Sequence, residues 1–317
     1  MPDFNSALDP DAKRFVELID LLGVPNWSTR YFFYPNDKYK AVIEVDRGRG
    51  MQIYWSEILA RTHLASATAI LRARQWIEAM RVAATASNLL SFSASFRGLL
   101  ESAADSSTAL RSVALTLARD HAHVLRALAG EAHSQGILAP ELENTLIHYA
   151  YAQHLTKAEL QAAPPSHKAL KVRDYIDMLE KGQVTDVVPC YQALCDLTHP
   201  GATSVWMWLH PVDEHTIEIQ ANQDGAVINH FLTEYRRTFV ELLMFAFNPA
   251  LATLRVLNYF TLADLHTAAL DKWDMSGVPI WKKCSEQLKG VQPRTRERLR
   301  IVKPNPSLQP TPRKRRG

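Results

Sequence analysis

The sequence predicts a mainly α-helical protein, a multi-helix bundle with one small β-hairpin insertion near residues 204–220. Ala and Leu are plentiful, whereas only 12 of the 317 residues are Gly, and this balance favours helices. Apolar residues recur at helical spacing along most of the chain. One stretch instead alternates apolar and polar residues on both sides of a Pro-Val-Asp-Glu loop, which is a hairpin pattern.

Composition divides the chain into three parts. They are an N-terminal helix with an irregular, aromatic-rich segment, a helical bundle domain that carries the hairpin, and a basic tail, with bounds 1–55, 56–290 and 291–317. The tail holds nine Lys or Arg and one acid, and such a segment is expected to be disordered. Without the tail the net charge of +3 becomes −5, which argues against a main surface built to bind nucleic acid.

Helix signals account for most of the remaining sequence. In the first part we expect a helix over 9–22, a short strand over 41–45 and a loop over 46–50. In the bundle, Ser56 is the expected cap of the first helix, and Pro249 is expected to separate the last two. The expected helices there cover 56–129 with breaks near 87–95 and 106–107, then 141–155, 168–181, 187–198, 225–247 and 249–270.

The cysteines and the hydropathy pattern indicate the cellular compartment of the protein. Cys190, Cys195 and Cys284 are odd in number and fit no zinc spacing, so we expect free thiols, no metal and no cofactor. No signal-peptide pattern and no run of about 18 apolar residues is present, so we expect no membrane partner. The sequence therefore predicts a cytoplasmic protein.

The first candidate site is a polar face on one predicted helix. Arg97, Glu101 and Asp105 are spaced four residues apart and so share a face. Two readings stay open. The face is solvated and holds a weak ion pair, or a buried Arg–Glu pair positions a catalytic His or an anionic ligand. On the opposite side lie apolar residues, Phe92, Phe96, Leu99, Leu100 and Ala103.

The second candidate is His199, in the last turn of the helix predicted over 187–198. Pro200-Gly201 stops that helix, so His199 is either a C-terminal cap or a positioned acid or base. Cys195 lies four residues before it, which would also allow a thiolate–imidazolium pair, although a structural Cys is commoner. We expect His199 to lie near Arg97 and Glu101 in the folded protein.

Two further groups have weaker chemical signals. His121 and His123 are two residues apart, so on one helix they point in different directions and cannot share a metal. Trp206, Trp208 and His210 fall on one side of the predicted hairpin and could stack bases. Because a lone hairpin needs packing to be stable, we expect this one to be buried between helices.

Two motifs carry a resemblance to a known group. Residues 95–101, with the pattern R-x-x-x-E, and residues 191–200, with a Tyr and a Cys before a terminal His-Pro, resemble a group of bacterial helical proteins of unknown function. These are distantly similar to the HEPN-type fold of RNases, toxins and phage-defence proteins. The ribonuclease signature of that fold is an Arg followed shortly by a His within a core helix. Arg119 and His123 leave too few residues between them to match it.

Two function classes follow from these observations. One is a helical recognition or regulatory protein, which the resemblance would place in bacterial defence, with a protein or nucleic-acid partner. The other is a HEPN-like enzyme that acts on RNA or nucleotides through Arg97, Glu101 and His199. The missing signature and the acidic body favour the first, and a homodimer is left open.

Overall fold

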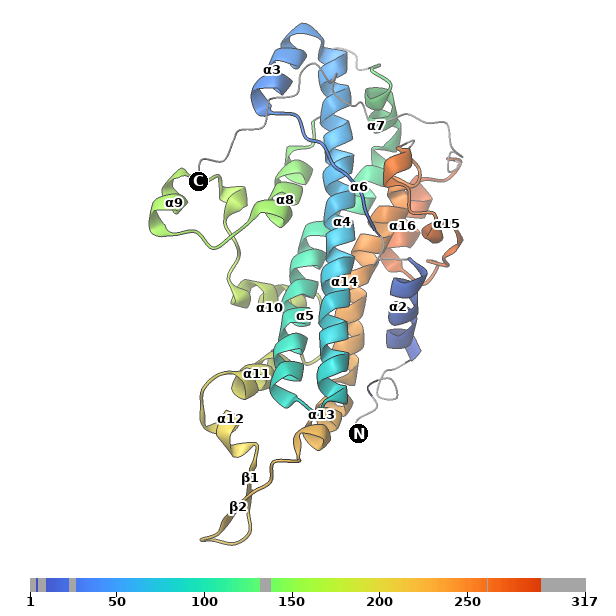
Figure 1. Ribbon diagram of the computed structural model, residues 1–317. Coiled ribbons are helices and arrows are strands. Elements are labelled where there is room, and N and C mark those ends of the chain that lie inside the picture. Colours follow the sequence, from blue (N-terminus) through green and yellow to red (C-terminus); the bar gives the residue numbers. More distant parts are fainter. Residues whose placement is uncertain (1–3, 5–9, 23–26, 132–137, 261, 292–317) are drawn as a thin grey trace.

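The computed structural model describes residues 4, 10–22, 27–131, 138–260 and 262–291, and the expected disorder of the tail falls outside them apart from residue 291. Three long helices form the centre of the molecule (Figure 1): α4 (Arg47–Thr85), α5 (Leu89–Leu110) and α14 (Arg236–Leu257). The other regular elements of the described chain are helices, apart from one two-stranded hairpin and an isolated bridge between Gln153 and Lys168. The predicted fold class, a mainly α bundle with a small hairpin, is confirmed.

The start of α4 corrects two expectations. The predicted strand over 41–45 is part of a helix, α3 (Asn36–Val45), and the predicted loop over 46–50 contains the N-cap and first turn of α4. Asp46, rather than Ser56, caps α4, because its carboxylate accepts a hydrogen bond from the amide of Arg49 at 2.9 Å and so satisfies one of the free donors of the first turn.

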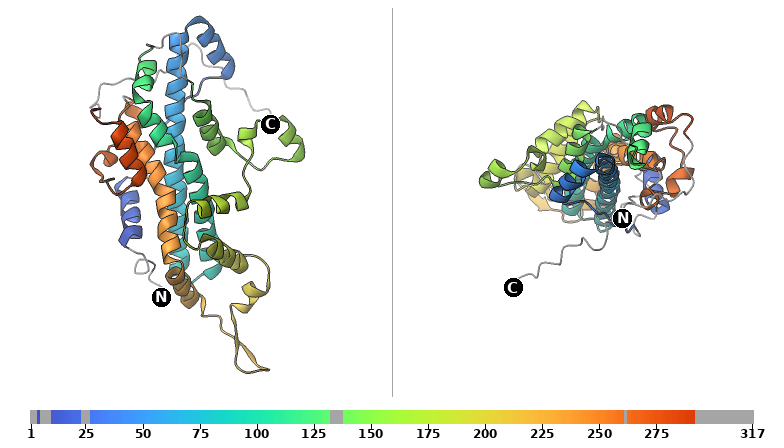
Figure 2. Two further views of the ribbon diagram at one scale, coloured as in Figure 1. Left: turned by 180° about the vertical axis from the view of Figure 1, so that it is seen from behind. Right: turned by 90° about the horizontal axis from the view of Figure 1, so that it is seen from above.

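A tight turn reverses the chain between α4 and α5. Ser87 has φ 50°, a left-handed conformation that ends a helix, and Asn88 then caps α5 by accepting from the amide of Ser91 at 2.9 Å. The two helices therefore run antiparallel and side by side, as Figure 2 shows from two directions. The break expected near 87–95 is real but spans only a few residues.

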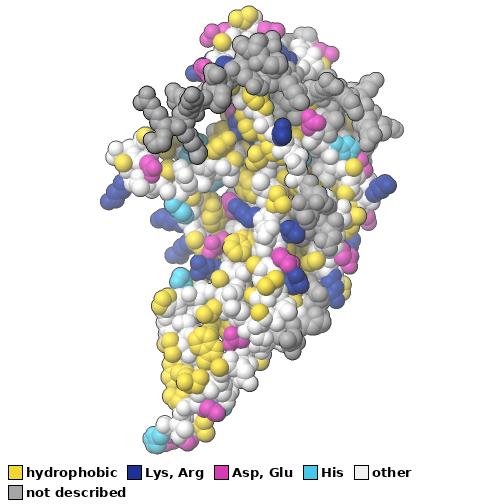
Figure 3. Space-filling model, in the orientation of Figure 1, with side chains coloured by type: hydrophobic (Ala, Val, Ile, Leu, Met, Phe, Trp, Pro, Cys, Tyr) yellow, Lys and Arg dark blue, Asp and Glu magenta, His cyan; other side chains and the backbone are white. Residues whose placement is uncertain are grey.

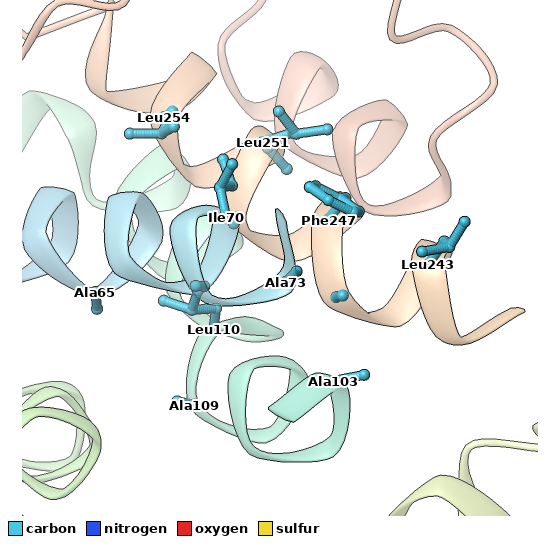
Figure 4. Close-up of a cluster of buried hydrophobic side chains, with 14 of the residues drawn as sticks. Ala65, Ile70, Ala73, Ala103, Ala109, Leu110, Leu243, Phe247, Leu251 and Leu254 are labelled. Carbon is cyan, nitrogen blue, oxygen red and sulfur yellow. The ribbon is translucent and has the colours of Figure 1, made fainter. Parts of the chain in front are cut away.

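The three central helices share one apolar core (Figure 4). Side chains such as Ile70 of α4, Leu110 of α5 and Phe247 of α14 are fully buried between them. Burying a side chain of this size stabilises the fold by about 1.5–3 kcal/mol. Pro249 does not end a helix as expected, because α14 runs through it and ends at Leu257. Its buried position in the core outweighs the lost backbone hydrogen bond.

The helix α14 is also long and apolar enough to cross a membrane when judged by length and composition alone. Of that apolar window, 67% is buried inside the protein, where α4 and α5 cover it. A core helix of a soluble protein has the same properties, and the burial of α14 agrees with that position.

Shorter helices cover the two sides of the core. On the α14 side lie α2 (Pro10–Leu21), α6 (Val113–Arg119), α7 (His121–Leu128), α15 (Ala269–Lys272) and α16 (Pro279–Gln287). On the α5 side lie α8 (Pro140–Tyr151), α9 (Lys157–Ala162), the 3₁₀ turn η2 (Pro165–His167), α10 (Val172–Lys181) and α11 (Val187–Thr198). Helices were expected over the regions of α2, α6, α7, α8, α10 and α11, whereas α9, η2 and α16 were not predicted, and the helix expected over 249–270 ends at Leu257. The bounds of α11 match the expectation, whereas those of α8 and α10 are shorter.

The hairpin segment projects from one end of the molecule (Figure 1). After α11 come α12 (Ala202–Trp206), β1 (Leu209–Pro211), β2 (Ile217–Ile219) and α13 (Asp224–Glu234). The strands are antiparallel, with Leu209 opposite Ile219 and Pro211 opposite Ile217. The expectation of burial is wrong, because every residue from His210 to Ile219 is exposed. The first part of the predicted hairpin, 204–206, is instead helical.

Candidate functional site

The polar face predicted on α5 exists and is half covered. Arg97 and Glu101 have side chains 30% and 28% exposed, and the Nε atom of Arg97 lies 3.4 Å from Oε1 of Glu101. The apolar residues on the other side of α5 are completely buried. The face of Arg97 and Glu101 is covered by α11, which packs along α5. The ion pair is thus neither fully solvated nor fully buried.

The structure brings His199 to this pair. Nη1 of Arg97 donates to Nε2 of His199 at 3.1 Å and to the hydroxyl of Thr198 at 3.3 Å. A ring nitrogen that accepts from a guanidinium carries no proton, so the contact requires the neutral imidazole. The predicted proximity of Arg97, Glu101 and His199 is confirmed, whereas a catalytic role for them stays a prediction.

The electrostatics of the cluster are dominated by partial burial. Burial raises the pKa of Glu101 above its usual range, although Arg97 opposes the shift. Oε1 of Glu101 is shielded from solvent and receives no hydrogen bond, so its contact with Arg97 is purely ionic. Burial and a hydrogen bond to Cys195 also raise the pKa of Tyr191. The hydroxyl of Tyr191 thus lies beside the thiol of Cys195, and a thiolate–imidazolium pair of Cys195 with His199 stays a prediction.

The cluster sits where the projecting segment begins. His199 is the C-cap residue of α11, and the chain leaves the body directly after it through Pro200-Gly201. Thr198 is also tied back to α11, because its hydroxyl donates to the carbonyl of Leu194 at 2.8 Å. Arg97 therefore fastens the last turn of α11 to α5 at the point of exit.

A second anchor holds the other end of the segment, and sequence reasoning missed it. Asp224, the first residue of α13, accepts from the indole Nε1 of Trp208 at 2.9 Å and from the amide of Leu89 at 3.2 Å. Leu89 is the first residue of α5, so α5 holds both ends of the segment. The available signal was an acid at a helix start, where carboxylates are favoured. We call residues 200–220, between these two anchors, the arm.

The arm carries an exposed apolar surface. Leu209, Pro211, Ile217 and Ile219 share one face of the hairpin because paired residues and residues two apart point the same way. Ile219 is 74% exposed and Trp206, in α12, is 50% exposed. Hydrophobic side chains gather over this end of the molecule in Figure 3. A contiguous apolar surface that protrudes from the body is typical of an interaction site.

The charge around the arm has one sign. Between Lys181 and Arg236 the sequence has seven Asp or Glu and no Lys or Arg. Three of the acids, Asp213, Glu214 and Glu218, lie on the hairpin and its tip and are exposed. This potential attracts cations and repels polyanions.

The remaining candidates behave as structural residues. His121 is buried against the ring of Phe260, and its Nε2 lies 3.1 Å from the carbonyl oxygen of Tyr259. His123 is exposed and contacts Arg126, so the two His side chains point apart as expected. Cys190, Cys195 and Cys284 are free thiols. In the part of the chain that is described, no group of three or more His, Cys, Asp or Glu is placed to hold a metal.

Comparison with known proteins finds no family model, no curated protein and no solved structure that matches this chain. The resemblance to HEPN-type proteins therefore stays an expectation from two short motifs.

Proposed function

We propose that this protein is a helical recognition protein and that the arm binds a protein partner with a positively charged rim. The observation that carries the proposal is the exposed apolar face of the hairpin and α12, held at both ends to α5. A short isolated hairpin is marginal in water, so an exposed one that is fastened at its base is suited to bind another surface.

The chemistry of the arm favours one kind of partner. Its apolar centre supplies the contact area, and its acids supply a complementary rim for Lys and Arg. Nucleic acid is disfavoured because phosphates would meet seven acids and no base. A second copy bound through the same face would place like charges together, so a homodimer through the arm is disfavoured for the same reason.

In this proposal the cluster of Arg97, Glu101 and His199 is a brace and performs no chemistry. Each of its contacts fixes the last turn of α11, from which the arm departs. The resemblance to defence proteins extends the proposal to a regulatory role in bacterial defence.

One observation favours a second candidate, the HEPN-like enzyme. An Arg and an exposed His lie 3.1 Å apart, and such a pair could bind a phosphate and transfer a proton. Incubation of labelled single-stranded RNA with the wild type and with His199→Ala separates the two. If the protein is a recognition protein, the RNA should stay intact with the wild type and with His199→Ala. Cleavage by the wild type that the variant loses, with its stability unchanged, would favour the enzyme.

The partner is tested by site-specific photo-crosslinking in the cells that naturally make the protein. A benzoylphenylalanine at position 217, on the arm, should give a discrete covalent adduct with one protein. The same residue at position 82 is the matched control, because Val82 of α4 is as exposed as Ile217, at 54% against 53%. That position should give no such adduct.

The captured partner is then purified and titrated against the wild type and against a triple variant, Asp213→Asn, Glu214→Gln, Glu218→Gln. Loss of the three exposed acids should weaken binding by about tenfold or more and reduce its salt dependence. An adduct with nucleic acid or with a second copy of this chain, equal labelling at position 82, or unchanged affinity of the triple variant would refute the proposal.

A further inference from the structure

A cavity of about 540 Å³ lies on the opposite half of the α5 polar face from the arm, between α5, α8, η2 and the segment that leads into α10. Its size falls in the range of small-molecule sites. The residues that argue for a ligand come from three separate segments: Asp105, Thr108, Asn144, His148, Pro165 and Leu170.

The carboxylate of Asp105 is fixed in the wall of this cavity. Nη2 of Arg72 donates to its Oδ2 at 2.6 Å, and the hydroxyl of Tyr175 lies 3.4 Å from its Oδ1. Burial raises the pKa of Tyr175 to about 12, so this hydroxyl keeps its proton and remains a donor. The pair with Arg72 neutralises the charge, while the second oxygen keeps capacity to accept hydrogen bonds.

The other polar groups of the cavity add mainly acceptors. Nδ1 of His148 donates to the carbonyl of Ser166 at 3.0 Å, and in the tautomer that carries its proton on Nδ1 the other ring nitrogen, Nε2, accepts. The hydroxyl of Thr108 donates to the sulfur of Met178 at 3.0 Å and keeps its lone pairs. Between them, Pro165 and Leu170 provide apolar wall. A matching ligand has an apolar body that faces Pro165 and Leu170 and N–H donors on its edge.

The segment that carries the wall residue Leu170 is basic. Lys168, Lys171 and Arg173 are exposed and lie within three residues of the wall residue Leu170. These cations suit an anionic group attached to the apolar body of the ligand. Asn144 is exposed on α8 and lines the cavity, where its amide can both donate and accept.

We infer that this cavity binds a nucleoside monophosphate, with the amino group of the base on Asp105 and His148 and the phosphate on the basic segment at residues 168–173. This site is independent of the arm, and its success or failure leaves the proposed function unchanged.

Isothermal titration of the full chain with AMP, GMP, CMP and UMP tests the inference. At least one of the three nucleotides whose base bears an amino group should bind with a Kd below about 1 mM, and UMP should bind about tenfold more weakly, a difference of about 1.4 kcal/mol. The double variant Lys168→Glu, Lys171→Glu should lower the affinity for the nucleotide. It should leave the affinity for the corresponding nucleoside unchanged. Inorganic phosphate alone should bind much more weakly than the nucleotide.

Asn144→Leu should lower the affinity at least about tenfold, because it fills the cavity and removes an amide. Asn229→Leu is the matched control, since Asn229 is equally exposed but lies on α13, away from the cavity. Both variants replace exposed residues and should fold. No binding of any of the four nucleotides, binding unchanged in Asn144→Leu, or phosphate binding as tight as nucleotide binding would overturn the inference.

Discussion

Replacing Arg97 by Ala tests whether the cluster braces the arm. The substitution removes the ionic contact with Glu101 and two hydrogen bonds, to Thr198 and His199. A partly exposed pair four residues apart on a helix contributes about 0.5 kcal/mol, and each hydrogen bond to a neutral acceptor about 0.5–1 kcal/mol. The expected loss is therefore about 2 kcal/mol, less than the 3–5 kcal/mol for breaking a fully buried pair.

Urea denaturation measures this loss directly. With an m-value of about 3 kcal/mol/M, a loss of about 2 kcal/mol lowers the midpoint by roughly 0.7 M. Hydrogen exchange gives the second readout, because release of the brace should reduce protection of amides in α11 and the arm more than in α4 or α14.

Arg81→Ala is the matched control for this experiment. Arg81 forms an ion pair with Glu78 on α4, with both side chains 47% exposed, and its guanidinium forms no hydrogen bond to another of the described elements. Its loss should cost about 0.5 kcal/mol or less. A cost for Arg97→Ala no larger than that of Arg81→Ala, or unchanged protection of the arm, would show that the cluster does not hold the segment in place.

Three more outcomes follow from the described contacts. Gly98→Ala should destabilise the protein by about 1–3 kcal/mol in the same urea assay, because an added Cβ would lie 2.6 Å from the ring of Trp76. Glu101→Gln should lessen the loss of stability with rising pH. Since the pKa of Glu101 is raised in the folded state above its ordinary value of 4.5, its ionisation costs stability as the pH rises from 4.5 through the folded value. Thiol titration of the native protein with a disulfide reagent at about pH 8 should label Cys195 before Cys190, because Cys190 is buried and its pKa is raised.

Each of these three has its own control. Gly201→Ala should leave stability unchanged, because nothing lies within 4 Å of the added Cβ. Glu180→Gln, an exposed acid on α10, should leave the pH dependence unchanged. In urea, Cys190 and Cys195 should react at similar rates. Equal effects at Gly98 and Gly201, parallel pH curves for Glu101→Gln and the wild type, or fast labelling of native Cys190 would contradict the packing described above.

Local signals predicted element types well where a helix had its own start and stop. The helix α11 was predicted with correct bounds, because Pro200-Gly201 must end it. The region around 41–50 was predicted wrongly. A short strand was expected over 41–45, yet a strand needs a partner strand for its backbone groups, and a helix meets this need internally. Pro249 shows the converse, because core packing overrode a local helix breaker.

The candidate site was predictable in part. Helical spacing placed Arg97 and Glu101 on one face, and the end of α11 placed His199 at a helix terminus. Whether that face is covered depends on how α11 packs on α5, a long-range contact that periodicity cannot give. The arm was expected to be buried because hairpins need support. The support comes from single polar contacts at its base, chiefly those of Asp224, and an acid at a helix start does not show in the sequence which residues it will contact.

The lack of Lys and Arg between Lys181 and Arg236 has a practical consequence for this protein. Trypsin cleaves only after those two residue types, so α11, the arm and the whole of α13 leave the digest as one long peptide, however accessible the hairpin is. Amine-directed cross-linkers likewise find no lysine anywhere on that surface. A complex formed through the arm would escape both methods, whereas a carboxyl-directed reagent would find three exposed targets at its tip, Asp213, Glu214 and Glu218.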